Sequence, residues 1–234
     1  MKMKKMGWLF LCYLSIIQLG LTQNKDVLMT NIQQIEDNTY QDVKGSPYYF
    51  TEWQLGKIYP VNDMDPIQEV LLNFNGYTQN FEIKKENYYT ALDEKWYNSI
   101  EIEQGDNTII YKKGLLPKDP NSFSRLIYQG NDFSIVYDFK VTLSTREQLL
   151  QSRLKEVKEF NRRPHYYLVK DGKAQVFKLK KRSILSLFST YSTKIENYAK
   201  KHHLKFSKES DLIKLFTIYN SLKGNQNNSI LGER

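Results

Sequence analysis

The chain has 234 residues, a formal net charge of +8 and a single cysteine, Cys12. Because Cys12 lies in an N-terminal segment that we expect to be removed, the mature chain is expected to lack disulfides, thiolate metal sites and a thiol nucleophile. Its stability must then come from buried apolar surface, and a chain of this length can bury a sizeable core.

The first residues have the layout of a secretory signal peptide. Three lysines precede an apolar run over residues 7–21, and this run is short for a membrane-spanning helix. We therefore predict a signal peptide over residues 1–22, cleaved after Thr22, with an uncleaved membrane anchor as the alternative. No small residue precedes Cys12, which disfavours lipid attachment there, and no later stretch is apolar for long enough to cross a membrane as a helix. The mature chain is expected to be exported.

The charges divide along the chain. Residues 23–150 contain 12 Lys and Arg against 19 Asp and Glu, whereas residues 151–234 contain 19 against 7. Basic surfaces often bind nucleic acid, but an exported protein rarely meets any, so no nucleic-acid partner is expected. The basic half is expected to face anionic lipid, phosphorylated glycolipid or an acidic partner protein. Attraction to the chain's own acidic half, or an ordinary solvated face, is the alternative.

Between residues 48 and 143 apolar and polar residues alternate, with turn residues about every ten positions, which predicts an antiparallel β region. Within "LLNFNGYTQNFEIKK", residues 71–85, Asn75-Gly76 has the composition of a tight hairpin turn with positive φ angles. The apolar residues on either side of it share one face of the expected hairpin: Val70, Leu72, Phe74, Phe81 and Ile83. We expect this face to be buried.

Further strands are expected over residues 108–112, 123–128 and 133–143, with a loop rich in Gly and Pro over residues 114–122. In "SIEIE", residues 99–103, the two isoleucines point one way and the two glutamates the other. Many short strands at this spacing favour an antiparallel sandwich or a partly closed barrel over a parallel sheet. The predicted β domain spans residues 23–150.

After residue 143 the pattern changes. Ser144 and Glu147 have the spacing of a helical capping box, and three apolar residues form a helical stripe, so a helix to about Phe160 is one interpretation. The stripe consists of Leu150, Leu154 and Val157. Residues 151–180 are expected to hold the end of this helix or a linker, followed by a β-hairpin that turns at Asp171-Gly172.

Residues 181–223 are expected to form a basic helical tail. A short helix spans residues 183–189, a second is capped by Thr193 with Glu196, and the last is capped by Ser207. The residues expected on the buried sides of the last two helices are Ile195, Tyr198, Ala199, His202, Leu212, Leu215, Phe216, Tyr219 and Leu222. Residues 224–234 are expected to be disordered. The predicted fold class is therefore α+β, with an antiparallel β sandwich or partly closed barrel followed by a small helical C-terminal region.

Residues suited to nucleophilic or metal-dependent catalysis are sparse. The histidines are His165, His202 and His203, and the adjacent pair points about 100° apart on a helix, which does not suit a shared metal ion. No serine stands in a Gly-x-Ser-x-Gly elbow, and no phosphate-binding glycine loop is present. We therefore predict no catalytic, cofactor-binding or metal-binding residue and no enzymatic activity.

Acidic residues leave one enzymatic alternative open, a glycoside hydrolase. Glu101 with Glu103, or Glu52 beside Trp53, could supply the pair of acidic groups that a glycoside hydrolase needs. These residues fit the solvent side of amphipathic strands better, because acidic side chains are mostly exposed.

Four segments follow one another along the chain: "KGSPYYFTEWQLGKIY", "VLLNFNGYTQNFEIKK", "YYLVKDGKAQVFKLKKRSILSLF" and "LIKLFTIYNSL". In this order they resemble a group of exported proteins common in Bacteroidetes bacteria, which share a "GSPY" segment, a hairpin and a lysine-rich helical tail. The chain departs from that group at Phe74-Asn75-Gly76, where Arg-Tyr-Asn would be expected. The resemblance implies a β-rich body, a helical tail and a location in the periplasm or against the outer membrane, and it implies no activity.

The leading hypothesis is a non-enzymatic cell-envelope protein that binds a partner protein or an anionic envelope surface through its basic tail. The residues expected to make that contact are Lys178, Lys180, Lys181, Arg182, Lys200 and Lys201. The alternative is a β-barrel or sandwich carrier that binds a lipid or glycan near Phe74, Tyr77 and Phe81. A carboxylate-dependent hydrolase is the third hypothesis.

Overall fold

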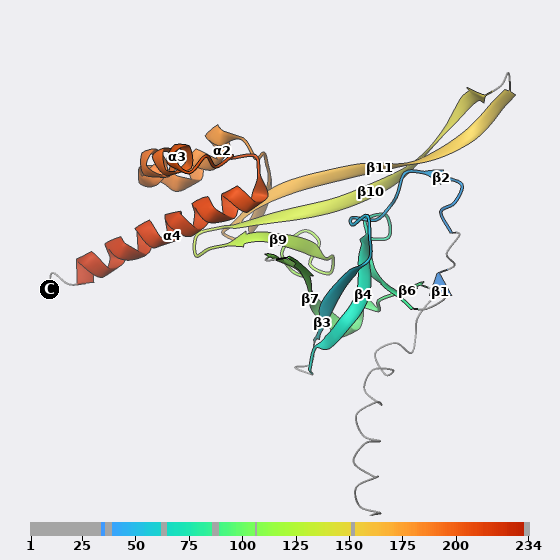
Figure 1. Ribbon diagram of the computed structural model, residues 1–234, viewed down its shortest axis with the longest axis horizontal. Helices are drawn as coiled ribbons and strands as arrows, with labels where there is room; N and C mark the ends of the chain where they lie inside the picture. The colour runs from blue at the N-terminus through green and yellow to red at the C-terminus, as the bar shows by residue number, and fades with distance from the viewer. Residues whose placement is uncertain are drawn as a thin grey trace, which may run out of the picture.

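The structure, a computed structural model, describes residues 34–35, 39–61, 65–85, 89–105, 107–150 and 153–231 (Figure 1). Most of these residues form one β-sheet, and helices at the C-terminal end of the chain pack against one end of that sheet. The predicted α+β class is confirmed. The predicted signal peptide over residues 1–22, which includes Cys12, lies outside the described residues.

Twelve strands make up the sheet in the described part of the chain. They are β1 (Gln34–Ile35), β2 (Val43–Lys44), β3 (Gln54–Pro60), β4 (Ile67–Asn75), β5 (Asn80–Lys84), β6 (Tyr89–Ala91), β7 (Tyr97–Gln104), β8 (Asn107–Lys112), β9 (Ser124–Gln129), β10 (Ser134–Leu150), β11 (Arg153–Lys170) and β12 (Lys173–Phe177). A short 3-10 helix, η2 (Glu94–Trp96), precedes β7.

The sheet is open. Its strand order is β1-β6-β5-β4-β3-β7-β8-β9-β10-β11-β12, and neighbours along this path are antiparallel. β2 adds a short parallel pairing to β11. Because β1 and β12 lie at opposite ends of this order, the strands form one open sheet instead of a closed barrel.

The first core lies where the sheet bends over itself. Leu72 pairs with Ile83 and Phe74 with Phe81 across the β4–β5 hairpin, and all four side chains are buried, as predicted. Across the core, the ring of Phe74 lies 6.5 Å from that of Phe139 on β10. The buried members of this core are Phe50, Ile58, Leu72, Phe74, Phe81, Ile83, Leu92, Tyr97, Ile100, Ile102, Tyr111, Phe123, Phe139, Val141 and Phe160.

The second core lies between strands β9 to β12 and four helical segments: α2 (Lys181–Leu185), η3 (Ser186–Tyr191), α3 (Ser192–Lys201) and α4 (Glu209–Leu231). Its buried members are Ile127, Phe133, Ile135, Leu168, Phe177, Ile184, Phe188, Tyr191, Ile195, Ala199, Leu212, Leu215, Phe216 and Tyr219. The predicted buried sides of the last two helices are therefore largely confirmed. The exception is His202, which is exposed just after the end of α3.

The capping box predicted at Thr193 is wrong. α3 begins one residue earlier, at Ser192, and follows η3 directly. Tyr191 before it already has helical backbone angles, φ −90° and ψ −1°. The chain kinks at Ser189, with φ 46° and ψ −120°, and α3 starts after Tyr191 without a hydrogen bond from a capping side chain.

The cap predicted at Ser207 is also wrong, since α4 begins at Glu209. The Asp211 carboxylate accepts a hydrogen bond from the backbone N–H of Lys205 at 3.0 Å and so stabilises the turn before the helix. α4 continues to Leu231, through part of the segment predicted to be disordered. None of the described helices combines the length and apolar character needed to cross a membrane.

The tight turn predicted at Asn75-Gly76 is wrong. The β4–β5 loop has four residues, 76–79, and its residue with positive φ is Gln79 at 59°. Asn75 orders the loop in a different way. Its Oδ1 accepts hydrogen bonds from the backbone N–H groups of Tyr77 and Thr78 at 2.9 and 3.2 Å. A side-chain acceptor of this kind replaces the backbone bond of a two-residue turn.

Gly76 is required by close packing. Its N–H donates to the carbonyl of Pro47, and its carbonyl accepts from the N–H of Val141, both at 2.8 Å. A methyl group at this position would lie 2.7 Å from the ring of Phe139 and 2.8 Å from the side chain of Val141. The β4–β5 loop therefore rests directly on β10.

The second predicted turn is confirmed. Asp171 and Gly172 have φ angles of 50° and 68°, and Lys170 pairs with Lys173 on either side of them. This is a two-residue turn between β11 and β12 with positive φ at both positions, as its composition predicts.

The helix predicted from Ser144 to about Phe160 is wrong. β10 and β11 pair without a register shift from Ser134–Val169 out to Leu150–Arg153, across the predicted boundary at residue 150. The helical spacing of apolar residues reflects only neighbours in the chain. The inner half of β10 is packed in the two cores as a strand, and its pairing with β11 continues outward through residues 143–150. We call the outer part of this hairpin, residues 143–150 and 153–160, the arm. It projects beyond the rest of the described chain (Figure 1).

We expect Gly76→Ala to lower the free energy of unfolding by about 1–3 kcal/mol, because the added methyl group must displace Phe139 or Val141 in a packed core. Urea unfolding followed by tryptophan fluorescence measures the loss. Gly224→Ala is the matched control, since nothing lies within 4 Å of its added methyl group and alanine favours the helix. Equal stability of the two variants would contradict the packing role of Gly76.

Candidate functional site

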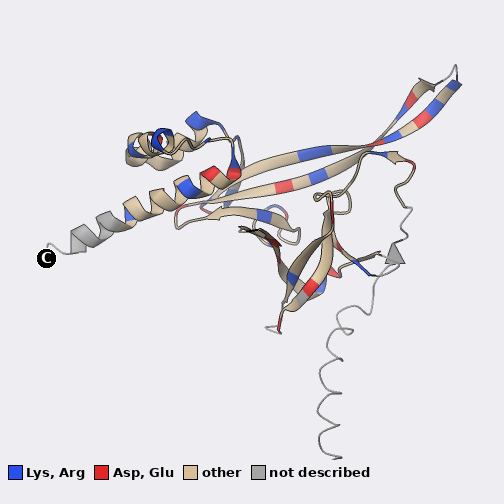
Figure 2. Cartoon of the chain, in the orientation of Figure 1, with Lys and Arg blue, Asp and Glu red and all other residues tan. Residues whose placement is uncertain are grey.

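The helical segment 178–208 carries a concentrated positive charge. It contains nine Lys and Arg and one acidic residue, Glu196. Apolar side chains such as Ile184, Phe188 and Ile195 face the second core, so the cations occupy the sides of the helices that face water. We call the exposed cations of this segment the basic layer. Figure 2 shows them as blue bands on α2 and α3.

All six residues predicted to bind a partner belong to segment 178–208. They are exposed members of the basic layer: Lys178, Lys180, Lys181, Arg182, Lys200 and Lys201. Lys181 and Lys200 pair with Glu196 at 2.8 and 3.1 Å, and hydrogen bonds from Lys181 and then Lys200 lower the pKa of the Glu196 carboxyl group. Such exposed pairs are weak. Within the described part of the chain, the other four cations form no ion pair.

Sequence reasoning missed three further members of the basic layer. Lys194, Lys205 and Lys208 are also exposed in segment 178–208. They were identifiable from the near absence of acidic residues, because Glu196 is the only one between Phe177 and Glu209. Counting basic and acidic residues over the whole segment therefore identifies the basic surface more completely than a search for adjacent lysines.

A partly buried ion pair fixes the start of α4 to the sheet. One nitrogen of the Arg125 guanidinium on β9, Nη2, lies 2.5 and 2.6 Å from the two carboxylate oxygens of Glu209. The Arg125 side chain is only 8% exposed. Its guanidinium carbon lies 4.6 Å from the centre of the Tyr137 ring and 5.3 Å from that of Tyr49, which adds cation–π attraction. The helices that carry the basic layer are thereby attached to the β-sheet at a defined point.

Tyrosines complete this junction between the two cores. Tyr166 on β11 donates a hydrogen bond to Glu209 Oε1 at 2.5 Å. Burial and this hydrogen bond raise the pKa of Tyr166 above its ordinary value, and burial raises the pKa of Tyr137 to about 12. Both phenols therefore stay protonated at neutral pH. The Arg125–Glu209 pair was not found from the sequence, although Arg125 is the one charged residue in the mostly apolar stretch "FSRLIY".

A buried carboxylate, Glu82 on β5, holds residues 40–48 against the sheet. Tyr48 donates to its Oε2 at 2.6 Å, and the side-chain amide of Asn75 donates to its Oε1 at 2.7 Å. The same amide group lies 3.2 Å from the hydroxyl of Tyr40. Burial raises the pKa of Glu82, against the opposing effect of the two hydrogen bonds.

Asn73 has a matching role one rung away. Its amide donates to the carbonyl of Phe50 at 2.9 Å, and its oxygen accepts from the N–H of Phe50 at 3.1 Å. Because these polar groups of β4 and β5 bind the backbone and side chains of residues 40–50, they account for the asparagines and glutamate of the hairpin without a ligand.

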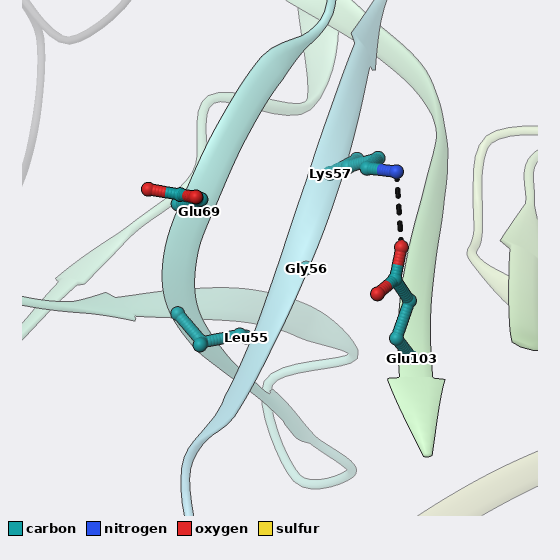
Figure 3. A pocket seen from close by; sticks show the side chains of 5 residues that line it. All are labelled: Leu55, Gly56, Lys57, Glu69 and Glu103. Carbon is teal, nitrogen blue, oxygen red and sulfur yellow. Dashed lines mark hydrogen bonds and ion pairs between the residues drawn. The ribbon is translucent and has the colours of Figure 1, made fainter. Parts of the chain in front are cut away.

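A shallow depression of about 340 Å³ lies on the outer face of the sheet (Figure 3). Its described lining residues are Leu55, Gly56, Lys57, Glu69 and Glu103. Lys57 donates a hydrogen bond to Glu103 at 3.0 Å, which raises the pKa of Lys57. These two charges neutralise each other.

The carboxylates named for hydrolysis do not converge in this depression. Glu101 accepts a hydrogen bond from Tyr59 at 2.7 Å and is not among its described lining residues, and neither is Glu52. Glu101 and Glu103 lie on the solvent-facing side of β7, as predicted, and Ile100 and Ile102 are buried on its other side. The hydrolase hypothesis therefore has no assembled site among the described residues.

The three residues predicted to bind a lipid or glycan are not brought together either. Phe74 and Phe81 pack on each other in the first core with ring centroids 5.0 Å apart, and both contact Tyr111. Tyr77 lies outside that core, 44% exposed, with its ring 5.4 Å from that of Phe160. These side chains do not line one common cavity.

The histidines are dispersed. His165 is exposed on β11, with Nδ1 3.1 Å from the carbonyl oxygen of Arg163, and His202 packs on Tyr198 with ring centroids 4.2 Å apart. Within the described ranges, no three His, Cys, Asp or Glu side chains gather in a way that could hold a metal ion.

No protein-family model, no curated protein and no solved structure matches this chain.

We expect Glu209→Gln to lower the free energy of unfolding by about 3 kcal/mol, because it leaves the Arg125 guanidinium buried without a counter-charge. Urea unfolding measures the change. Glu196→Gln, which breaks only exposed pairs, should cost less than about 1 kcal/mol. The double variant Arg125→Met with Glu209→Met should recover part of the loss, because no charge is then buried. A single variant as stable as Glu196→Gln would argue against the junction.

The pH dependence of stability should report on Glu82. A carboxyl group with a raised pKa in the folded state contributes stability that is fully present below its ordinary pKa of 4.5 and is lost as the pH rises through the folded-state pKa. The stability of the parent chain relative to Glu82→Gln should therefore increase as the pH falls from about 8 to about 4.5. Parallel urea titrations of both proteins measure this difference. Asp138, whose pKa is also raised by burial, is present in both proteins and cancels. A difference independent of pH would show that Glu82 does not titrate as its burial requires.

Proposed function

We propose that this chain is a non-enzymatic cell-envelope protein that docks on an anionic surface through the basic layer. The observation that carries the proposal is the charge of segment 178–208, where nine cations stand against the single carboxylate of Glu196. The N-terminal lysines followed by an apolar run support export to the envelope.

The composition of the basic layer favours a lipid surface over a protein partner. Eight of the nine cations in the segment are lysine. Protein interfaces are enriched in arginine and aromatic residues and depleted in lysine. A lysine ammonium group is a hydrated point charge on a flexible stem, which suits a diffuse layer of phosphate head groups. Each cation near such a layer contributes about 1 kcal/mol.

The attachment of the helices gives this docking a direction. The second core and the Arg125–Glu209 pair hold the helical segments against strands β9 to β12. The cations therefore move with the β body as one unit. Contact through the basic layer would orient the sheet and the arm relative to the surface.

We expect the triple variant Lys180→Glu, Lys181→Glu and Arg182→Glu to bind anionic vesicles at least about 100-fold more weakly than the parent chain, because three contacts of about 1 kcal/mol each are lost. Co-sedimentation with vesicles of phosphatidylethanolamine and phosphatidylglycerol measures binding. Affinity of the parent chain should also fall as salt is added, because salt screens exposed charges.

The matched control reverses three exposed lysines of the β body, Lys95, Lys112 and Lys118, to glutamate. It changes the net charge by the same amount but leaves the basic layer intact, so its affinity should change only a few-fold. Equal losses in the two triple variants would show that net charge alone, and not the basic layer, attracts the chain. A parent chain that does not bind these vesicles would overturn the proposal.

A further inference from the structure

The arm presents a patterned face. Directly opposite residues of β10 and β11 lie on the same side of the ribbon, so each opposed pair forms a rung. The face that continues the core side of β10 carries four rungs, from the tip inward: Leu149/Leu154, Glu147/Glu156, Thr145/Lys158 and Leu143/Phe160. Their character runs apolar, acidic, basic, apolar.

The two outer rungs are unfavourable in an isolated ribbon. Leu149 and Leu154 are 67% and 68% exposed, the most exposed large apolar side chains among the described residues. Glu147 and Glu156 stand directly opposite each other, and like charges in this arrangement destabilise a sheet. A two-stranded ribbon is at best marginally stable in water. A partner that covers the leucines and neutralises the glutamates would remove both defects.

On the opposite face of the arm, the acidic side chain has two cationic partners, one of them Lys44 of β2. Glu159 on that face lies 3.1 Å from Arg146 and 3.6 Å from Lys44. On the patterned face, Glu156 is 3.7 Å from Lys158, and Glu147 forms no ion pair with any described residue. The acidic side chain of the arm that lacks an ion pair with any described residue is therefore on the face with the leucines.

We propose that two copies of this chain pair through their arms, antiparallel and with the patterned faces in contact. When a second arm is turned end for end and placed against the first, apolar rungs face apolar rungs and each acidic rung faces a basic rung. Because β10 then lies on β10 and β11 on β11, Glu156 of one copy faces Lys158 of the other, and Glu147 faces Thr145. The leucine rung of one copy faces the Leu143 rung of the other. A two-fold axis between the acidic and basic rungs makes each contact occur twice, as in the isologous interfaces of most homodimers.

The root of the arm offers an apolar seat for the leucines of the second copy. Leu143 is 37% exposed there, and Tyr77 of the β4–β5 loop is 44% exposed beside Phe160. The charges alternate in sign along the arm (Figure 2). Tyr77, proposed above as a ligand contact from the sequence, is thus placed where the tip of a second arm would arrive.

The size of the contact sets its strength. Four rungs extend over about 27 Å of strand, so two such faces bury on the order of 500 Å² in total. Stable specific interfaces bury about 1,200 Å² or more. We therefore expect a weak, reversible dimer. The inference does not rest on docking to a surface, although two proteins held on one surface would meet at a higher effective concentration.

Two complementary charge reversals test this pairing. In Glu156→Lys alone and in Lys158→Glu alone, both symmetric contacts become repulsive, so each variant should self-associate at least about tenfold more weakly than the parent chain. In an equimolar mixture of the two variants, both contacts of the mixed dimer are attractive again, so association should return to the parental level. Sedimentation equilibrium from micromolar to millimolar concentration measures all three.

The mixture also controls for a loss of arm stability in either variant, because variants that failed to fold could not restore each other. Lys155→Glu, on the opposite face of the arm, is the charge control and should leave association unchanged. Leu149→Ser with Leu154→Ser should abolish the dimer, whereas Val176→Ser, at an exposed position on β12, should not. A parent chain that stays monomeric over the whole range would overturn the proposal and leave the arm to a different protein. A mixture that stays monomeric would overturn the antiparallel pairing of rungs.

Discussion

The uninterrupted pairing of β10 with β11 is the constraint on which the rest of the structure depends. One face of β10 passes in turn through the second core at Ile135, the junction at Tyr137, the first core at Phe139 and Val141, and then the arm. A shift of one residue in a strand moves every side chain to the other face. This single register therefore positions both cores, the basic layer and the rungs of the arm.

The junction at Arg125 explains how a sheet with two separate apolar cores holds them in one arrangement. Removing two charges from water largely offsets their mutual attraction, so a buried pair contributes more to a defined geometry than to stability. Here Glu209 opens α4 and Arg125 belongs to β9, with Tyr166 of β11 as a third partner. A polar contact that can be satisfied in only one orientation specifies where the helices lie on the sheet, which apolar packing alone would specify less sharply.

Local patterns in the sequence were sufficient for much of the fold and for part of the site. Alternation predicted the buried face of the β4–β5 hairpin, and helical spacing predicted the sides of α3 and α4 that enter the second core. The turn at Asp171-Gly172 followed from composition, because both residues adopt positive φ there. The exposure of the six lysines and arginines expected to contact a partner was predictable from charge alone, because charged side chains on an amphipathic helix lie on its solvent-facing side.

The sequence by itself therefore determined the hydrophobic periodicity of most segments, the class of the fold and the sign of the charge on the surface of the helical segment. Only the tertiary structure decided the role of Gly76, whose missing side chain makes room for Phe139 some sixty residues away. The tertiary structure likewise decided the state of residues 144–150 and 153–160, which have helical spacing but extend as strands. It also decided that Arg125 and Glu209 meet. The physical reason is the same in each case: periodicity and turn chemistry act between neighbours in the chain, whereas close packing, strand register and buried ion pairs depend on residues that only folding brings into contact.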